Sequence, residues 1–119
     1  MRVVVIDDDL GVRRGLARLL RASGFEVTTY ASAEAFLGRP ANDEGICLVL
    51  DIHLAGMSGL ELAGYLDEQG RSVPIVFISA QEGSLPPQRW ARSGTIAFLR
   101  KPFDEGLLIE AVSRALAPG

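Results

Sequence analysis

Acidic, hydroxyl and amino side chains follow four of the five apolar runs of the sequence. They comprise two aspartates after the first run, one after the third, a serine after the fourth and a lysine shortly after the fifth: Asp7, Asp8, Asp51, Ser79 and Lys101. Carboxylates held ~4 Å apart repel by roughly 4 kcal/mol per pair at an effective dielectric of about 20. A hard divalent cation offsets this repulsion, and magnesium is commonly held by one or two carboxylates with water and phosphate oxygens. Three converging aspartates therefore favour a magnesium site.

An aspartate in such a site can also attack phosphorus. The product would be an aspartyl-phosphate, whose charge a magnesium ion and the ammonium of Lys101 would stabilise, while Ser79 would offer a hydroxyl donor. Each residue also has a simpler interpretation, because an acidic run such as 7–9 is usually a helix cap or a solvated turn, and a lone lysine is usually a surface residue. For Asp9 we keep the simpler interpretation. For the others, the decision depends on the elements that position them.

Apolar runs of strand length alternate with amphipathic stretches of helix length, which predicts an α/β fold with a parallel sheet covered by helices on both faces. The predicted strands are 2–6, 25–30, 46–50, 75–78 and 95–99. Side chains able to cap a helix mark the helix starts after the first, second, third and fifth strands: Asp8 or Asp9, Ser32, Ser58 and Asp104. A fourth helix near 88–93 should be short, because Pro86 and Pro87 restrict the residues before them. In such a sheet ligands bind beyond the carboxyl ends of the strands, so the candidate residues should meet at one edge.

The size and composition of the chain fit one globular domain. With 119 residues, 48% of them hydrophobic and 23% charged, residues 1–119 are expected to fold as one domain. A formal net charge of -3 gives this segment no reason to bind nucleic acid or an anionic membrane by itself. The first apolar run is too short for a signal peptide or a membrane span, so a cytoplasmic protein is expected. The single cysteine, Cys47, cannot form an internal disulfide and is expected to be a buried hydrophobe.

Five short segments occur in the order and at the spacing of the motifs of bacterial response-regulator receiver domains. They are Val5-Ile6-Asp7-Asp8-Asp9, Leu50-Asp51, Met57-Ser58-Gly59, Ile78-Ser79-Ala80 and Phe98-Leu99-Arg100-Lys101-Pro102-Phe103. The chain resembles this family from Arg2 to about Leu116, and five motifs in order are much more specific than any one of them. The resemblance implies a flavodoxin-like, doubly wound sheet of five parallel strands in the order 2-1-3-4-5, with five helices, the fourth short or irregular.

The resemblance also implies roles for the residues at the strand ends. Asp51 would be the phosphoacceptor, and Lys101 would contact the phosphoryl group. The implied ligands of Mg²⁺ are three carboxylates and one backbone carbonyl: Asp7, Asp8, Asp51 and His53. For the side chain of His53 we expect a solvent-facing position, because the sequence has no second histidine to share a metal ion.

The resemblance further implies a switch that other molecules read. Ser79 takes the position of the switch hydroxyl, and Phe98 that of the switch aromatic ring, which turns inward when the hydroxyl moves toward the phosphoryl group. Family members receive phosphate from a sensor histidine kinase or from small donors such as acetyl phosphate and lose it to water, so the chain would catalyse only its own phosphorylation and dephosphorylation.

Segments 33–37 and 101–103 look closest to receivers that precede a helix-turn-helix output domain, which indicates transcriptional regulation. The resemblance suggests a homodimer on phosphorylation and DNA binding only through an output domain outside this chain, with no membrane partner. Three positions depart from the usual receiver pattern. Ala55 replaces the usual proline four residues after the phosphoacceptor, so that loop should be more mobile; Ser79 replaces the commoner threonine and keeps the hydroxyl. Pro86 and Pro87 put in doubt a dimer face built on the fourth helix.

Three other functions stay open at this point. A magnesium-dependent phosphohydrolase also uses an aspartyl-phosphate but normally needs a second carboxylate soon after the nucleophile, whereas Ile52, His53 and Leu54 follow here. A flavodoxin-like flavin carrier has a similar fold, but the acidic run 7–9 would repel its flavin phosphate. A degenerate receiver regulated by binding alone would not need the complete acidic set. The phosphorylation switch is therefore the preferred hypothesis.

Overall fold

The computed structural model describes residues 2–39, 44–79, 95–101 and 104–116. Five strands are present: β1 (Arg2–Ile6), β2 (Glu26–Tyr30), β3 (Ile46–Asp51), β4 (Ile75–Ser79) and β5 (Thr95–Arg100). Four helices occur in the described part of the chain: α1 (Leu10–Ala22), α2 (Ala33–Leu37), α3 (Gly59–Glu68) and α4 (Glu105–Leu116). The predicted short helix at 88–93, with Pro86 and Pro87, lies outside the described residues, so α4 is the helix predicted after the fifth strand.

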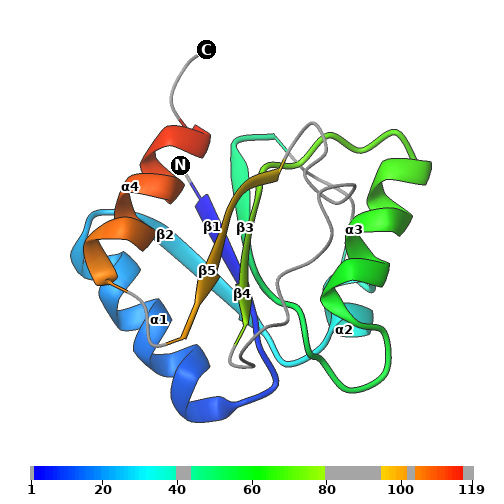
Figure 1. Cartoon of the computed structure of the whole chain (residues 1–119), viewed down its shortest axis with the longest axis horizontal. Coiled ribbons are helices and arrows are strands. Elements are labelled where there is room, and N and C mark those ends of the chain that lie inside the picture. The colour runs from blue at the N-terminus through cyan, green and yellow to red at the C-terminus, as the bar shows by residue number, and fades with distance from the viewer. Residues whose placement is uncertain (1, 40–43, 80–94, 102–103, 117–119) are drawn as a thin grey trace.

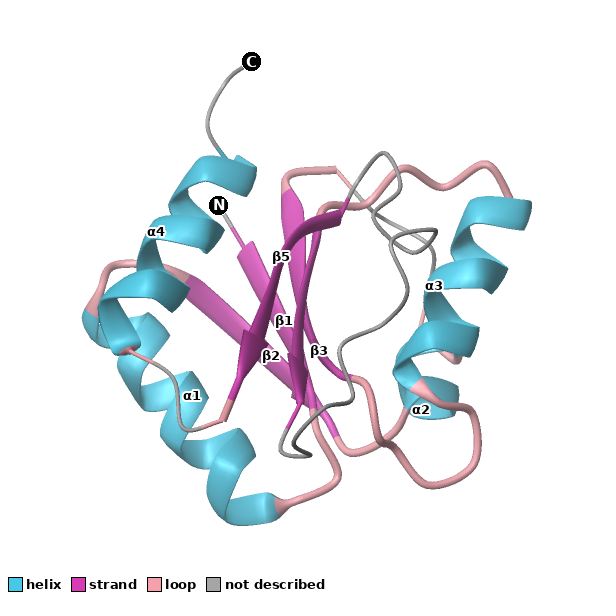
Figure 2. Cartoon of the chain, in the orientation of Figure 1, coloured by secondary structure: helices cyan, strands magenta, loops and turns pink. Residues whose placement is uncertain are grey.

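The strands form one parallel sheet in the order β2-β1-β3-β4-β5, which confirms the expected topology. β1 and β3 lie side by side, with Ile6 opposite Leu50. In Figure 1, α1 and α4 cover one face of the sheet, and α2 and α3 cover the other. The carboxyl ends of the strands lie toward the lower edge of the view in Figure 2. No helix in the described ranges has the length and hydropathy that a membrane crossing requires.

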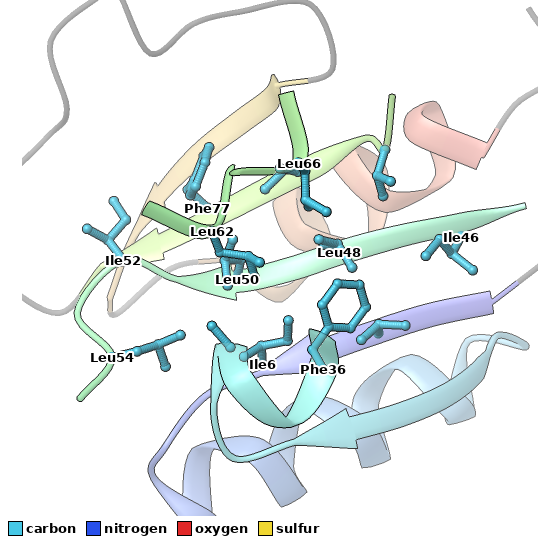
Figure 3. Packing of buried hydrophobic residues seen from close by; sticks show 14 residues of the cluster. Ile6, Phe36, Ile46, Leu48, Leu50, Ile52, Leu54, Leu62, Leu66 and Phe77 are labelled. Atoms are coloured by element: carbon cyan, nitrogen blue, oxygen red, sulfur yellow. The ribbon is translucent and has the colours of Figure 1, made fainter. Parts of the chain in front are cut away.

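The central strand β3 is buried on both faces of the sheet. All six of its residues are buried, as expected for a parallel strand covered by helices on both sides. Leu48 and Leu50 pack in the cluster under α2 and α3, together with Phe36 (Figure 3). Cys47 and Val49 point into the second cluster, under α1 and α4. Cys47 is fully buried, as predicted, and burial raises the pKa of its thiol to about 12. Each leucine buried here contributes about 1.5–3 kcal/mol, which makes the end of β3 a firm support.

Helix caps set the path of the chain where it leaves the carboxyl edge of the sheet. The Asp9 carboxylate accepts a hydrogen bond from Val12 N at 3.0 Å, so Asp9, and not Asp8, caps α1. Ser58 and Glu61 form a capping box at the start of α3, as the sequence indicated for Ser58. Because Asp9 supplies the cap, the carboxylate of Asp8 is available for other contacts.

Candidate functional site

Three carboxylates meet where β1 and β3 end. Asp7 follows β1 and Asp51 is the last residue of β3, and the pairing of these strands brings both aspartates to the same edge. One carboxylate oxygen from each of Asp7, Asp8 and Asp51 lies within 4.8 Å of the others. Asp7 and Asp51 are buried, at 0% and 7% exposure, whereas Asp8 is exposed. The structure thus brings together the three acidic residues that follow the first and third apolar runs; we call them the acidic cluster.

A lysine and a serine from the neighbouring strands extend this group. Ser79 is the last residue of β4 and is buried, and Lys101 directly follows β5. The backbone carbonyl oxygen of Ser79 accepts a hydrogen bond from Lys101 N at 2.7 Å. Nζ of Lys101 lies 3.2 Å from Oδ2 of Asp7, forming an ion pair with a carboxylate that is fully buried. Arg13 of α1 also donates from Nη1 to the backbone carbonyl of Asp7 at 2.8 Å. No motif in the sequence points to this contact, since Arg13 is one of four arginines in α1.

The environment of Asp51 makes its carboxylate harder to ionise than an exposed one. Burial is the largest cause and raises the pKa of Asp51 above its ordinary value of 3.8, against the hydrogen bond from His53 N, which lowers it. Repulsion from Asp7 and Asp8 raises the pKa further, while the charge of Lys101 lowers it. A cation among these carboxylates would offset the cost of ionising Asp51, and their oxygens are the ligands that Mg²⁺ prefers. The residues present therefore fit a hard divalent cation.

The loop between β3 and α3, residues 52–58, is tied to the acidic cluster by its backbone. His53 N donates to Asp51 Oδ1 at 3.0 Å, and Ala55 N donates to Asp8 Oδ2 at 3.3 Å. A proline at position 55 would lack this donor, so Ala55 allows a hydrogen bond that the usual residue cannot form. The side chain of His53 is exposed, as expected. Greater mobility of this loop stays a prediction.

Another contact to this loop comes from α2. Met57 N donates to Glu34 Oε2 at 3.1 Å, and this bond is the main reason that the pKa of Glu34 lies below its ordinary value of 4.5. Glu34 was not among the candidates from the sequence. The two residues are 23 positions apart, and no spacing or motif connects them.

Phe98, at the expected position of the switch aromatic, lies on β5. Its ring is half-buried and stacks on Phe77, with the centroids 5.0 Å apart and the planes 8° apart. Phe98 also packs against the cluster of buried residues under α2 and α3. The ring therefore lies on the face of the sheet that α3 covers.

Comparison with known proteins agrees with the fold. The family model for the response regulator receiver domain matches residues 3–113. Nodulation protein W of Bradyrhizobium diazoefficiens is 39% identical over 114 residues, which cover 95% of this chain and 50% of that protein. Transcriptional regulatory protein FixJ of Azorhizobium caulinodans is 40% identical over 115 residues, which cover 96% of this chain and 54% of that protein.

Solved structures agree as well. Response regulator StyR has a TM-score of 0.91 at 43% identity, covering 97% of this chain and 58% of that one. FixJ-N has a TM-score of 0.85 at 36% identity, covering 96% of this chain and 91% of that one. The chain spans about half the length of the curated relatives it matches. On this evidence, the chain belongs to the receiver domains of two-component response regulators.

Proposed function

We propose that this receiver domain is a phosphorylation switch in which Asp51 accepts a phosphoryl group beside Mg²⁺. The main support is the meeting of Asp7, Asp8 and Asp51 within 4.8 Å, with the ammonium of Lys101 3.2 Å from Asp7. Phosphoryl transfer to an aspartate needs a nucleophilic carboxylate, ligands for a metal ion and a cation that pairs with phosphate. These four side chains supply all three at one edge of the sheet.

Mg²⁺ would be held by three carboxylates and one backbone carbonyl: Asp7, Asp8, Asp51 and His53. When bound, the ion would neutralise charge on these carboxylates and on the transferring phosphoryl oxygens. Asp7 is well fixed for this task, because its Oδ1 accepts from Asp9 N at 2.9 Å and its Oδ2 pairs with Lys101. Pre-set ligands reduce the ordering that ion binding requires.

Asp51 is the nucleophile in this proposal. Its Oδ1 accepts the His53 N–H, which orients the carboxylate and leaves Oδ2 as the attacking oxygen. A bond forms between Oδ2 and phosphorus while the bond from phosphorus to the donor breaks, and the donor leaves with that electron pair, as a kinase imidazole or as acetate. Lys101 pairs with one phosphoryl oxygen, and Ser79 donates its hydroxyl hydrogen to another. Attack of water on phosphorus later releases inorganic phosphate and restores the Asp51 carboxylate.

The phosphoryl donor in this proposal is a sensor histidine kinase in the cytoplasm. A hollow of about 440 Å³ along α1 and β2 offers a protein partner a positive surface. Its lining includes Leu10, which is exposed, and the four arginines of α1: Arg13, Arg14, Arg18 and Arg21. Although the chain as a whole has a net charge of -3, the arginines make this surface locally positive, and a positive surface favours an acidic partner surface.

The response to phosphorylation passes through Ser79 and Phe98 in this proposal: Ser79 moves toward the phosphoryl group, and the Phe98 ring turns with it. Residues 1–119 form one receiver domain, and an output domain elsewhere in the protein regulates transcription and binds DNA. Support comes from relatives named transcriptional regulatory proteins, TdiR and FixJ, of which this chain spans about half. Phosphorylation would also favour a homodimer.

The test is the mass of the intact chain after incubation with acetyl phosphate. With Mg²⁺, the wild type should gain one phosphoryl group and Asp51→Asn should gain none, because an amide oxygen is a poor nucleophile. The matched control is Asp9→Asn, which keeps a capping side chain on α1 and should gain the group. Chelation of divalent cations should abolish the gain. A phosphorylated Asp51→Asn chain would contradict the choice of acceptor, and a gain in the presence of chelator would contradict the role of the ion.

A further inference from the structure

The middle of the loop 52–58 is held by two carboxylates that lie outside β3 and α3. Ala55 N donates to Asp8 Oδ2 at 3.3 Å, in the acidic cluster. Met57 N donates to Glu34 Oε2 at 3.1 Å, on α2. The two amides are close neighbours in the chain, so the path of the loop is set at one point by the cluster and at the next by α2.

The carboxylate of Glu34 also lies against the turn itself. Gly56 has a φ of +74°, and a Cβ built on it would lie 2.5 Å from Glu34 Oε2. A side chain at position 56 would meet this carboxylate and would also be strained by the positive φ. Glu34 therefore fits closely against two consecutive residues of the loop, Gly56 and Met57.

Glu34 reaches the loop from a fixed base. Its helix neighbours Ala33 and Phe36 are buried, at 0% and 1% exposure, and Figure 3 shows Phe36 packed among the side chains over β1 and β3. The Phe36 ring also meets Tyr30 edge-on at 5.8 Å between centroids, and the Arg39 guanidinium lies 4.5 Å from its centroid. These contacts fix the short helix α2, although the Glu34 side chain itself is exposed.

We propose that Glu34 is a positioning residue for the magnesium site. Together with the hydrogen bond from His53 N to Asp51 Oδ1, it holds the loop so that the backbone of His53 lies at the acidic cluster. This inference rests on the proposed function, because it concerns the same ion. An ordered loop favours binding of the ion and, by linkage, binding of the ion favours the ordered loop. Loss of the Glu34 carboxylate makes the loop less ordered, so it should weaken Mg²⁺ binding. Coupling of this kind typically changes affinity by about fivefold or more.

Calorimetric titration with Mg²⁺ tests this coupling. Glu34→Ala should weaken binding about fivefold, whereas Glu34→Gln should recover part of the loss, because its amide oxygen can still accept the Met57 N–H. Glu68→Ala is the matched control, since Glu68 is an exposed glutamate at the end of α3, and it should bind like the wild type. Wild-type affinity in Glu34→Ala would overturn the inference, and so would an equal loss in Glu68→Ala.

Amide hydrogen exchange without Mg²⁺ gives a second measurement that needs no ion. Glu34→Ala should accelerate exchange at both Met57 and Ala55, with a melting temperature close to that of the wild type. Acceleration at Met57 alone would overturn the inference, because the rest of the loop would then keep its path without Glu34. Failure of the proposed function would give a different result, because the wild type would then bind no Mg²⁺, or Asp51→Asn would bind Mg²⁺ as tightly as the wild type. In either case the inference about Glu34 would also fail.

Discussion

The turn after β1 and the loop after β3 carry the same candidate site, but they are held in place in different ways. The turn after β1 is held mainly by its own residues, although Asp7 also pairs with Lys101, 94 positions away, and its N–H donates to Tyr30 O. Asp9 N donates to Asp7 Oδ1, two positions away, and the Asp9 carboxylate accepts from Val12 N, three positions away. Such short-range bonds form as soon as the turn forms, and they need no contribution from other elements.

The two ends of the loop after β3 are held by nearby residues of β3 and α3, whereas its middle depends on distant residues. Its bond from Ala55 to Asp8 joins residues 47 positions apart, and its bond from Met57 to Glu34 joins residues 23 positions apart. The loop therefore takes its path from the turn after β1 and from α2. Substitutions in either element should change the middle of this loop, whereas the hydrogen bonds of Asp9 in the turn after β1 should tolerate changes elsewhere. The predictions that follow test this asymmetry.

The largest effect is expected where the loop after β3 enters α3. A Cβ on Gly59 would overlap the backbone carbonyl oxygen of Asp51 and lie 3.0 Å from Ile52 Cα, so Gly59→Ala must displace backbone. We expect a loss of about 1–3 kcal/mol in the free energy of unfolding, measured by urea denaturation. Gly15→Ala is the matched control, because a Cβ there meets nothing within 4 Å and should add about 0.5–1 kcal/mol. Similar stability in the two variants would contradict the close approach at Gly59.

A smaller effect on stability is expected when the carboxylate of Asp51, at the end of β3, is compared with that of Asp9, in the turn after β1. Burial raises the pKa of Asp51 above 3.8, so the carboxyl group of Asp51 binds a proton more firmly in the folded chain than in the unfolded chain. The contribution of Asp51 to stability therefore falls as the pH rises from about 3.8 through its pKa in the folded state. Asp51→Asn removes this ionisation and keeps an acceptor for His53 N, so without divalent cations it should be more stable than the wild type at neutral pH.

The control for this comparison is Asp9→Asn, which keeps a helix cap and should leave the stability nearly unchanged. Urea denaturation at acidic and neutral pH measures both variants against the wild type. The advantage of Asp51→Asn should shrink toward pH 4 and should also shrink when Mg²⁺ is added to the wild type. An advantage that is independent of pH would show that the ionisation of Asp51 is not its cause.

The same asymmetry explains how far the sequence could predict this molecule. The strands were predictable because short apolar runs alternate with amphipathic segments, and the caps at Asp9 and Ser58 because a capping side chain acts on residues close to it. The acidic cluster was predictable in position, since parallel strands end at one edge of the sheet. The order of the strands needed the family resemblance, because alternation alone does not decide which strands pair.

Contacts that depend on the path of a loop were not predictable. The sequence indicated Ala55 only as a missing proline, and its hydrogen bond to Asp8 exists because the folded loop returns to the turn after β1. Glu34 and Arg13 had no signal at all, since each acts on a backbone group in another segment. A backbone donor or acceptor is available at almost every residue, so residue type says nothing about such a partner.

The smallest effect is expected for Ala55→Pro. Proline removes the N–H that donates to Asp8, an exposed bond worth about 0.5–1.5 kcal/mol, but it also restricts the unfolded chain, which contributes about 0.4–1 kcal/mol. Ala55 does not have a positive φ, so its backbone is on the side that proline needs. The two terms nearly cancel, and urea denaturation should show a change below about 0.5 kcal/mol. Hydrogen exchange at Met57 should stay slow, because Glu34 still holds that amide. If exchange at Met57 in Ala55→Pro were instead as fast as in Glu34→Ala, the bond from Met57 N to Glu34 would depend on the bond from Ala55 N to Asp8, and α2 would not hold the loop independently.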